Sequence, residues 1–240
     1  MMIDITAPPI QPLVAASILS ADFGHMTAEC RDVLDKGADL LHIDVMDGHF
    51  AGNLTMGQDM IRGLRRHLPD TFLDVHLMVD RPSNYIDDFA DAGANLFTFH
   101  LEACQPQKVD GDNASVLIER ILATGMHAGM AINPPTAIDG LTPYLDQLAL
   151  VLIMSVHPGR SGQQFIADVL EKTQILKTQL DMTTRLEMDG GINPSTAPSA
   201  AAAGVDVLVS ASALFGADNR AAAIAQMHAS DGHSQINCSQ

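Results

Sequence analysis

Residues 35–50 read DKGADLLHIDVMDGHF, and this stretch contains the pattern that decides the fold. A charged segment ends at Gly37, as helices often do, and a run of apolar residues follows over 40–46. Similar junctions occur at DAGANL (91–96) and AAAGVDV (201–207). A helix that ends at glycine and turns sharply into a buried strand is typical of alternating α/β proteins.

The same alternation extends along the whole chain and predicts eight strand–helix units. The predicted strands cover 14–17, 40–46, 72–78, 96–100, 127–132, 148–154, 185–189 and 205–211. The predicted helices cover 25–37, 57–68, 82–92, 113–124, 136–146, 163–180, 195–203 and 218–229. Such alternation implies a parallel sheet, and eight units in 240 residues leave no room for a second domain.

We therefore predict the α/β class and a single-domain (β/α)8 TIM barrel over residues 1–229, followed by a disordered polar tail over 230–240. Residues 104–113 are predicted to form a loop. A doubly wound open sheet is the alternative, but it is expected to show G-x-G-x-x-G after its first strand, and this sequence has no such motif.

Composition narrows the possible functions. The formal net charge of −16 disfavours nucleic acid and anionic membranes as partners, and no apolar run approaches the length of a membrane span. Three scattered cysteines and the lack of a secretory signal suggest a cytoplasmic protein without disulfides. None of the four lysines ends an apolar strand, which argues against Schiff-base chemistry.

Polar residues gather at the carboxyl ends of the predicted strands, where barrels carry their chemistry. His42 and Asp44 are two residues apart, so they share the inward face of one strand, while Leu41, Ile43 and Val45 face the helices. His76 and Asp189 approach the same end from two other strands.

Two imidazoles and two carboxylates at one point predict a site for one divalent metal ion. Zinc is the first choice, with iron, manganese or cobalt as alternatives. His100 alone is expected to be a hydrogen-bonded core group, and Asp47 is expected to be a turn residue.

Short loops follow the last three predicted strands, and the first two contain glycine. They are HPGRSGQQF (157–165), DGGIN (189–193) and SAS (210–212), and their backbone amides could hold a phosphate. Three methionines at strand ends, Met46, Met78 and Met154, are expected to form an apolar wall of the pocket.

Several motifs in this order resemble the ribulose-phosphate 3-epimerase family, from about residue 13 to residue 216. They are ASILSADF (16–23), HIDVMDGHF (42–50), DVHLMV (74–79), FHLEA (99–103), NPPT (133–136), MSVHPGRSGQQFI (154–166), DGGIN (189–193) and SALFG (212–216). The resemblance implies a (β/α)8 barrel and a metal held by His42, Asp44, His76 and Asp189.

The resemblance also implies an isomerase that interconverts D-ribulose 5-phosphate and D-xylulose 5-phosphate. Asp44 and Asp189 are expected to act as base and acid at C3, and a bound metal to stabilise a cis-enediolate. The expected substrate contacts are Ser17, His42, His76, Gly159, Arg160, Ser161, Gly162, Gly190, Gly191, Ala211 and Ser212. The expected partner is a small phosphorylated ketose, and the chain is expected to be a homo-oligomer.

The sequence departs from the family pattern at the predicted phosphate site. HPGRSGQ stands where the family usually has NPGFGGQ, and Ala211 stands where it has glycine. Another ketose phosphate, such as D-allulose 6-phosphate, therefore remains an alternative substrate. A metal-dependent aldolase and a non-catalytic sugar-phosphate binding barrel are further alternatives, whereas a decarboxylase is disfavoured because DVMDG lacks its lysine.

Overall fold

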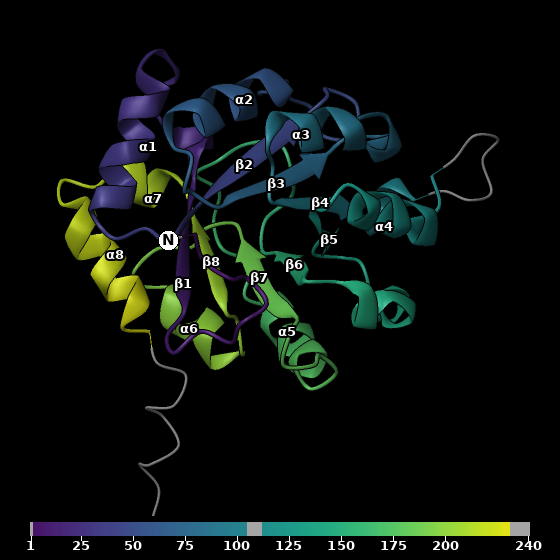
Figure 1. Ribbon diagram of the computed structural model, residues 1–240. Coiled ribbons are helices and arrows are strands. Elements are labelled where there is room, and N and C mark those ends of the chain that lie inside the picture. Colours follow the sequence, from purple (N-terminus) through teal and green to yellow (C-terminus); the bar gives the residue numbers. More distant parts are fainter. Residues whose placement is uncertain (1, 105–111, 231–240) are drawn as a thin grey trace, which may run out of the picture.

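The computed structural model describes residues 2–104 and 112–230, and it shows a closed barrel of eight parallel strands (Figure 1). Each strand pairs with its neighbours in chain order, and β1 closes the ring against β8. The strands are β1 (Leu13–Ser17), β2 (Leu40–Met46), β3 (Leu73–Met78), β4 (Leu96–His100), β5 (His127–Ile132), β6 (Leu150–Met154), β7 (Arg185–Asp189) and β8 (Val207–Ser210). The predicted (β/α)8 barrel is confirmed.

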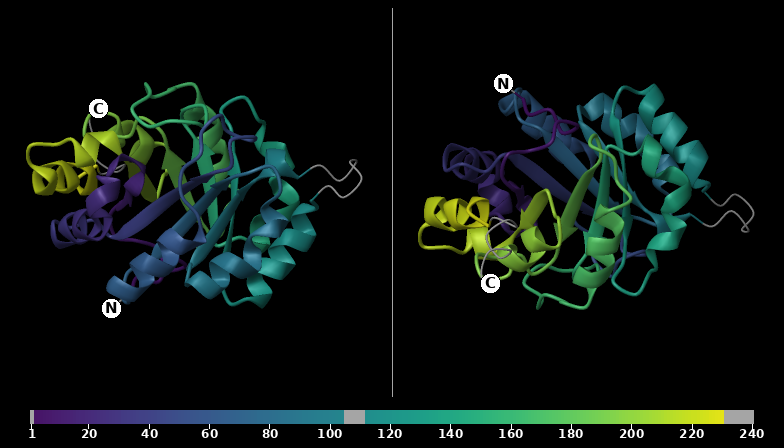
Figure 2. Two further views of the ribbon diagram at one scale, coloured as in Figure 1. Left: turned by 90° about the horizontal axis from the view of Figure 1, so that it is seen from above. Right: turned by 90° about the horizontal axis from the view of Figure 1, so that it is seen from below.

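Helices surround the barrel on its outside, as the two views in Figure 2 show. They are α1 (Met26–Asp35), α2 (Gln58–His67), α3 (Ile86–Ala92), α4 (Ala114–Ala123), α5 (Val169–Lys177), α6 (Ala197–Ala202), α7 (Ser212–Phe215) and α8 (Arg220–His228). Short 3-10 helices cover Ile18–Ser20, Phe23–His25, Pro82–Asn84 and Leu101–Ala103. The four-residue helix α7 was not expected from the sequence.

The prediction of an α-helix over 136–146 is wrong. Two 3-10 helices, Ile138–Gly140 and Thr142–Gln147, connect β5 to β6 instead. Gly140 disfavours a continuous helix, and Pro143 has no N–H group to donate to the preceding turn. The segment still closes the barrel at this point, since Ile138 and Leu141 are buried in the core.

Two layers of side chains result from the alternation along each strand. Leu41, Ile43 and Val45 pack outward into the large core between strands and helices, as predicted. The inward face carries a smaller apolar cluster that includes Leu40 and Leu150. It also carries buried polar groups, which are concentrated in the half of the barrel near the carboxyl ends of β2, β3 and β7.

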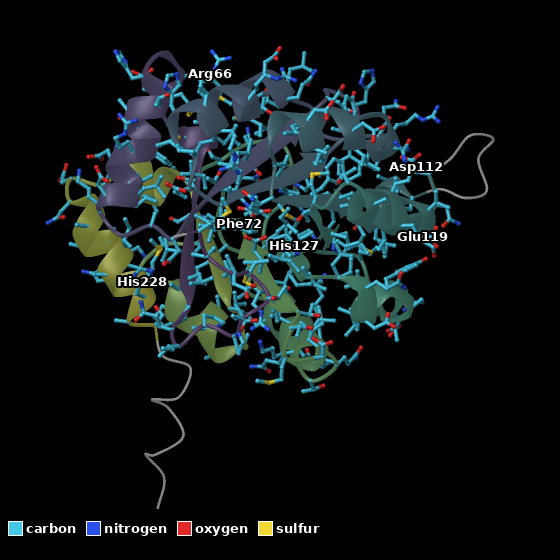
Figure 3. The ribbon with its side chains drawn as sticks, in the orientation of Figure 1. Arg66, Phe72, Asp112, Glu119, His127 and His228 are labelled. Atoms are coloured by element: carbon cyan, nitrogen blue, oxygen red, sulfur yellow. The ribbon has the colours of Figure 1, made fainter. Side chains whose placement is uncertain are left out.

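The amino end of the barrel is closed by apolar and aromatic side chains. Ile5, from the segment before β1, is completely buried and packs with Phe72 in the inner cluster. Phe72 stacks on His127 with ring centroids 6.4 Å apart, and both are labelled near the middle of Figure 3. Because this end is filled, a substrate has access only from the carboxyl ends of the strands.

At the C-terminus, Ser230 is buried and its N–H donates to the carbonyl of Met227 in α8. The remainder of the predicted disordered tail, 231–240, lies outside the described residues, as does 105–111 of the predicted loop. Among residues 2–104 and 112–230, no helix is both long enough and apolar enough to cross a membrane.

Candidate active site

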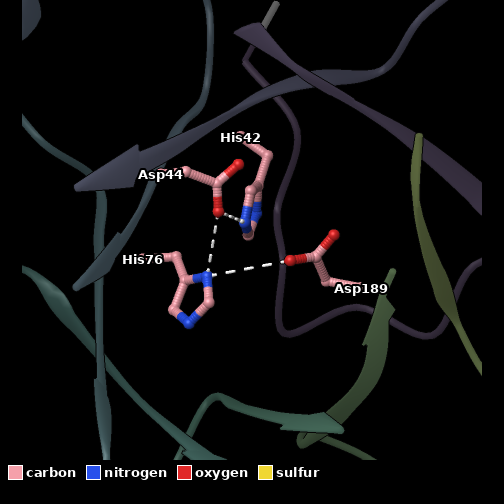
Figure 4. A group of neighbouring side chains, drawn as sticks. All are labelled: His42, Asp44, His76 and Asp189. Atoms are coloured by element: carbon pink, nitrogen blue, oxygen red, sulfur yellow. Dashed lines mark hydrogen bonds and ion pairs between the residues drawn. The ribbon is translucent and has the colours of Figure 1, made fainter. Parts of the chain in front are cut away.

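The structure brings together four polar residues from three strands at the carboxyl end of the barrel (Figure 4). His42 and Asp44 come from β2, His76 from β3 and Asp189 from the last position of β7. Asp44 lies directly beside His76 in the register of the two strands. One potential ligand atom from each residue lies within 4.8 Å of the others.

Asp44 is at the centre of this cluster. Its Oδ1 lies 3.2 Å from His76 Nδ1 and 3.4 Å from His42 Nε2. Asp189 Oδ2 completes the group at 4.0 Å from His76 Nδ1. Ser17, at the end of β1, donates its hydroxyl hydrogen to Asp44 Oδ2 over 2.5 Å, which fixes the orientation of the carboxylate.

The two carboxylates of the cluster differ in their electrostatic surroundings. Burial raises the pKa of Asp44, but the charge of His42 at 3.4 Å and the hydrogen bond with His76 outweigh burial and hold the pKa well below its usual range. Burial, and then the nearby charge of Asp44, raises the pKa of Asp189 to about 7. Two carboxyl groups with opposite pKa shifts in one site are typical of acid–base pairs.

The residues fit a divalent metal ion. The Nε2 atom of His42 is buried and has no hydrogen-bond partner among the described residues, although it faces Asp44. Burial lowers the pKa of His42, but the charges of Asp74 and Asp44 outweigh burial and raise it. A cation between these side chains would therefore replace the proton on Nε2 and bind its lone pair. Burial lowers the pKa of His76 to about 4, which keeps this imidazole neutral as a metal ligand requires. Two nitrogens and two carboxylate oxygens suit zinc and its neighbours in the first transition series.

A cavity of about 380 Å³ opens above the cluster. Asp44 and Asp189 line its base, together with Met46, Met78 and Met154. The other predicted substrate contacts that line it are Ser17, Gly159, Arg160, Ser161, Gly162, Gly190, Gly191, Ala211 and Ser212. His42 and His76 are fully buried and are not among the residues that line this cavity.

Comparisons with known proteins agree with this geometry. The sequence model described as the ribulose-phosphate 3 epimerase family matches residues 13–215. The chain belongs to the ribulose-phosphate 3-epimerase family. It is therefore an enzyme, an isomerase of the carbohydrate epimerase type.

Two curated relatives show how far the similarity extends. The ribulose-phosphate 3-epimerase of Mycobacterium tuberculosis strain H37Rv is 42% identical over 234 residues, which cover 95% of this chain and 96% of the relative. The cytoplasmic isoform from Oryza sativa subsp. japonica is 42% identical over 207 residues, which cover 85% and 87%. Among solved structures, tryptophan synthase of Mycobacterium tuberculosis superposes with a TM-score of 0.66 at 14% identity, covering 92% of each chain, and shows the shared fold alone.

In this epimerase-family chain, two buried acids beneath the cluster were missed by sequence reasoning. Asp74 Oδ2 lies 2.5 Å from His42 Nδ1, and Glu187 Oε1 lies 3.6 Å from the same nitrogen. Burial, and then the charge of Asp74, raises the pKa of Glu187 well above its usual range, which favours the neutral form of Glu187. A signal was available, because Asp74 and Glu187 stand two residues before His76 and Asp189 and so share their inward face.

Asp74→Asn is expected to weaken metal binding about 10- to 100-fold, because a carboxylate that accepts from the far nitrogen of a ligating histidine fixes its tautomer and raises its basicity. Competition with a chromophoric chelator measures the change in metal Kd. Glu187→Gln is the matched control, since it keeps a neutral side chain at a neighbouring position, and a change below about threefold is expected. Equal effects of the two variants would contradict an orienting role for Asp74.

The glycines of the DGG motif allow close approach of the loops after β6 and β7. Gly191 has a φ of +66°, and a Cβ at this position would lie 2.6 Å from the backbone nitrogen of Phe165. Gly190 has a φ of +124°, and its Cβ would lie 2.7 Å from the backbone nitrogen of Val156. The loops after β6 and β7 therefore meet at the cavity only because these residues have no side chains.

Gly191→Ala is expected to destabilise the protein by about 2–4 kcal/mol, because it combines positive-φ strain with a clash against backbone. Guanidinium unfolding measures this free energy. Gly125→Ala is the matched control: its φ is +89°, but no atom lies within 4 Å of the added Cβ, so about 1 kcal/mol is expected. A loss for Gly191→Ala no larger than the control would show that the loops can separate without cost.

Proposed function

We propose that this chain is a metal-dependent 3-epimerase that interconverts D-ribulose 5-phosphate and D-xylulose 5-phosphate. One observation carries the proposal: Asp44 and Asp189 line the same cavity from strands that are not neighbours, and both contact the same buried imidazole. Two carboxylates that reach a substrate from different sides can remove a proton from one face of a carbon and return one to the other.

Asp44 removes the C3 proton in one direction, and Asp189 delivers a proton to the opposite face. Their roles exchange in the reverse direction, through a cis-enediolate. The hydrogen bond from Ser17 holds Asp44 Oδ2, so Asp44 keeps one orientation during the transfer. A divalent metal, when bound by His42, Asp44, His76 and Asp189, supplies Lewis-acid stabilisation of negative charge on the C2 and C3 oxygens.

The far end of the cavity suits the phosphate of the substrate. Residues of the loops after β6, β7 and β8, Arg160 among them, line this part of the cavity. Their backbone N–H groups and the Arg160 guanidinium are donors that would hold a phosphate. Gln163 Nε2 donates to the carbonyls of His157 and Arg160 and so holds the first of these loops in shape. Binding energy at the phosphate would position C3 between the two carboxylates.

Met46, Met78 and Met154 line the cavity beside Asp44 and Asp189, and they give the reacting end of the cavity an apolar wall. Such surroundings exclude water from the carbanion-like intermediate and prevent its protonation by solvent. This separation favours stereochemical control by Asp44 and Asp189.

The test is proton NMR in heavy water with metal-loaded protein and a panel of pentulose and hexulose phosphates. Loss of the C3–H signal and appearance of the 3-epimer are expected for D-ribulose 5-phosphate. Faster turnover of D-allulose 6-phosphate would show that the preferred substrate is this hexulose phosphate and not D-ribulose 5-phosphate. Triose products would indicate an aldolase. Binding of the sugar phosphates without exchange at C3 would refute an epimerase.

We also propose that the protein is a cytoplasmic homo-oligomer. The printed name of the rice relative refers to a cytoplasmic isoform, and the scattered cysteines of this chain are compatible with the same reducing compartment. Light scattering during size-exclusion chromatography would test the expected homo-oligomer against the 25.6 kDa of one chain.

A further inference from the structure

A further inward-facing polar residue, His100, lies against the proposed metal centre without belonging to it. His100 ends β4 and is completely buried. Its Nε2 lies 2.8 Å from His76 Nε2, and the two rings stack with centroids 5.0 Å apart. This contact is on the far side of His76 from the atom that faces Asp44 and Asp189.

The contact continues to a carboxylate at the rim of the barrel. Glu102 Oε2 lies 3.1 Å from His100 Nδ1. Its other oxygen accepts from the backbone N–H of Asn133 over 2.7 Å and from the hydroxyl of Thr136. Burial raises the pKa of Glu102, but its bonds with His100, Thr136 and Asn133 outweigh burial and lower the pKa to about 2. Glu102 is therefore an ionised acceptor fixed to the loop after β5.

The positions of the protons follow from these contacts. If His76 Nδ1 binds a metal, its proton must be on Nε2, because a neutral imidazole carries one N–H. His100 Nε2 must then accept that hydrogen, so the proton of His100 is on Nδ1. This N–H points at Glu102, which can only accept. The contacts His76–His100 and His100–Glu102 then each have one donor and one acceptor. The opposite tautomer of His100 would place its Nε2–H against the Nε2–H of His76.

The contact between His76 and His100 is shielded from solvent. The ring of Phe50 covers His100 at a centroid distance of 4.7 Å, and neither His76 nor His100 is exposed to solvent. A buried N–H of His76 without an acceptor would carry the full cost of desolvation. The orientation of His76 therefore depends on a protein acceptor at this position.

We propose that His100 and Glu102 are positioning residues that act in series, Glu102 fixing the tautomer of His100 and His100 fixing that of His76. In this arrangement His76 Nδ1 stays unprotonated and directed at Asp44 and Asp189. The inference rests on the metal centre described under the proposed function. It differs from the Asp74–His42 contact because a second imidazole separates the carboxylate from the ligand.

The experiment compares two substitutions of His100 whose side-chain amides extend to different distances from the backbone. The amide of His100→Gln extends to the place of Nε2 and can accept from His76, whereas that of His100→Asn extends only to the place of Nδ1. With Co2+ as the probe, His100→Asn is expected to raise the metal Kd at least about tenfold and to alter the visible absorption of the bound ion. His100→Gln is expected to restore Kd to within about threefold of wild type and to retain the wild-type spectrum.

Thr136→Val is the matched control. It removes one anchor of Glu102 on the side away from the metal and leaves the bond to His100, so Co2+ affinity and spectrum are expected to stay unchanged. If His100 only stabilised the loop after β5, Thr136→Val would reproduce the effect of His100→Asn, and the inference would be wrong. Equal Kd values for His100→Asn, His100→Gln and wild type would also overturn it.

His76→Ala, which leaves no ligand atom at this position, separates failure of this inference from failure of the proposed function. If His76→Ala loses Co2+ affinity and His100→Asn does not, the metal centre stands and the role of His100 is refuted. If His76→Ala also binds Co2+ as tightly as wild type, the metal centre itself is refuted. Thermal unfolding of each apoprotein shows whether a loss of affinity comes from loss of the fold.

Discussion

Asp189→Asn is expected to lower the rate of epimerisation by about 10²- to 10⁴-fold in both directions, because the variant has no group that can transfer a proton on one face of C3. Asp44 is unchanged on the other face. One of the two epimers should therefore still exchange its C3 proton with solvent deuterium without forming the other epimer. Proton NMR of each epimer in heavy water measures exchange and inversion separately.

The result depends on two controls. Metal content must match wild type, since asparagine retains one oxygen that can serve as a ligand. Asp88→Asn, which changes an exposed carboxylate on α3 far from the cavity lining, should leave both rates unchanged. Full turnover in Asp189→Asn would exclude the two-base mechanism, and equal loss of exchange from both epimers would show that Asp189 does more than act on one face.

Removal of the metal is expected to lower turnover by at least about 10³-fold, because Lewis-acid stabilisation of developing charge is worth several kcal/mol and each 1.36 kcal/mol changes a rate tenfold.

Removal of the metal is also expected to lower the melting temperature. A ligand at 1,000 times its Kd stabilises the native state by about 4.1 kcal/mol, and dialysis against a chelator removes that contribution. Activity assays and thermal unfolding of the same apoprotein test both effects.

Restoration of the metal identifies the preferred ion. Zinc, iron, manganese and cobalt are expected to restore turnover, whereas magnesium and calcium are expected to be poor because half of the ligand set is imidazole. His76→Ala is the matched control, since it leaves no ligand atom at this position and its stability should respond little to the chelator. An apoprotein with full activity would refute a metal-dependent reaction.

The strands of the barrel were predictable because most are short apolar runs, and the polar residues of β2, β3 and β7 stand at alternate positions. Predicted and observed bounds differ by at most two residues at any strand end, and β2, β4, β5 and β7 agree fully. The segment after β5 was not predictable in the same way. Its apolar residues Ile138 and Leu141 have helical spacing, but Gly140 and Pro143 favour shorter 3-10 turns.

The four residues of the proposed metal centre were also predictable. His42 and Asp44 share one face of a strand, and parallel strands of a barrel bring their carboxyl ends to one rim. The same rule applied to Asp74 and Glu187 would have predicted that they face inward, but not that they contact His42. That contact depends on how β2, β3 and β7 are staggered along the barrel, and this stagger cannot be read from the sequence.

The sequence by itself determined the eight-stranded barrel, the inward direction of the polar residues and the family. It did so because burial on both faces, a period of two along each strand and the motif order are all local properties of the chain. Only the tertiary structure decided that His76 contacts His100, that Glu102 is tied to the loop after β5 and that His42 Nε2 has no hydrogen-bond partner among residues 2–104 and 112–230. These features depend on side-chain rotamers and distances between residues far apart in the chain, where differences of about 1 Å separate a hydrogen bond from no interaction.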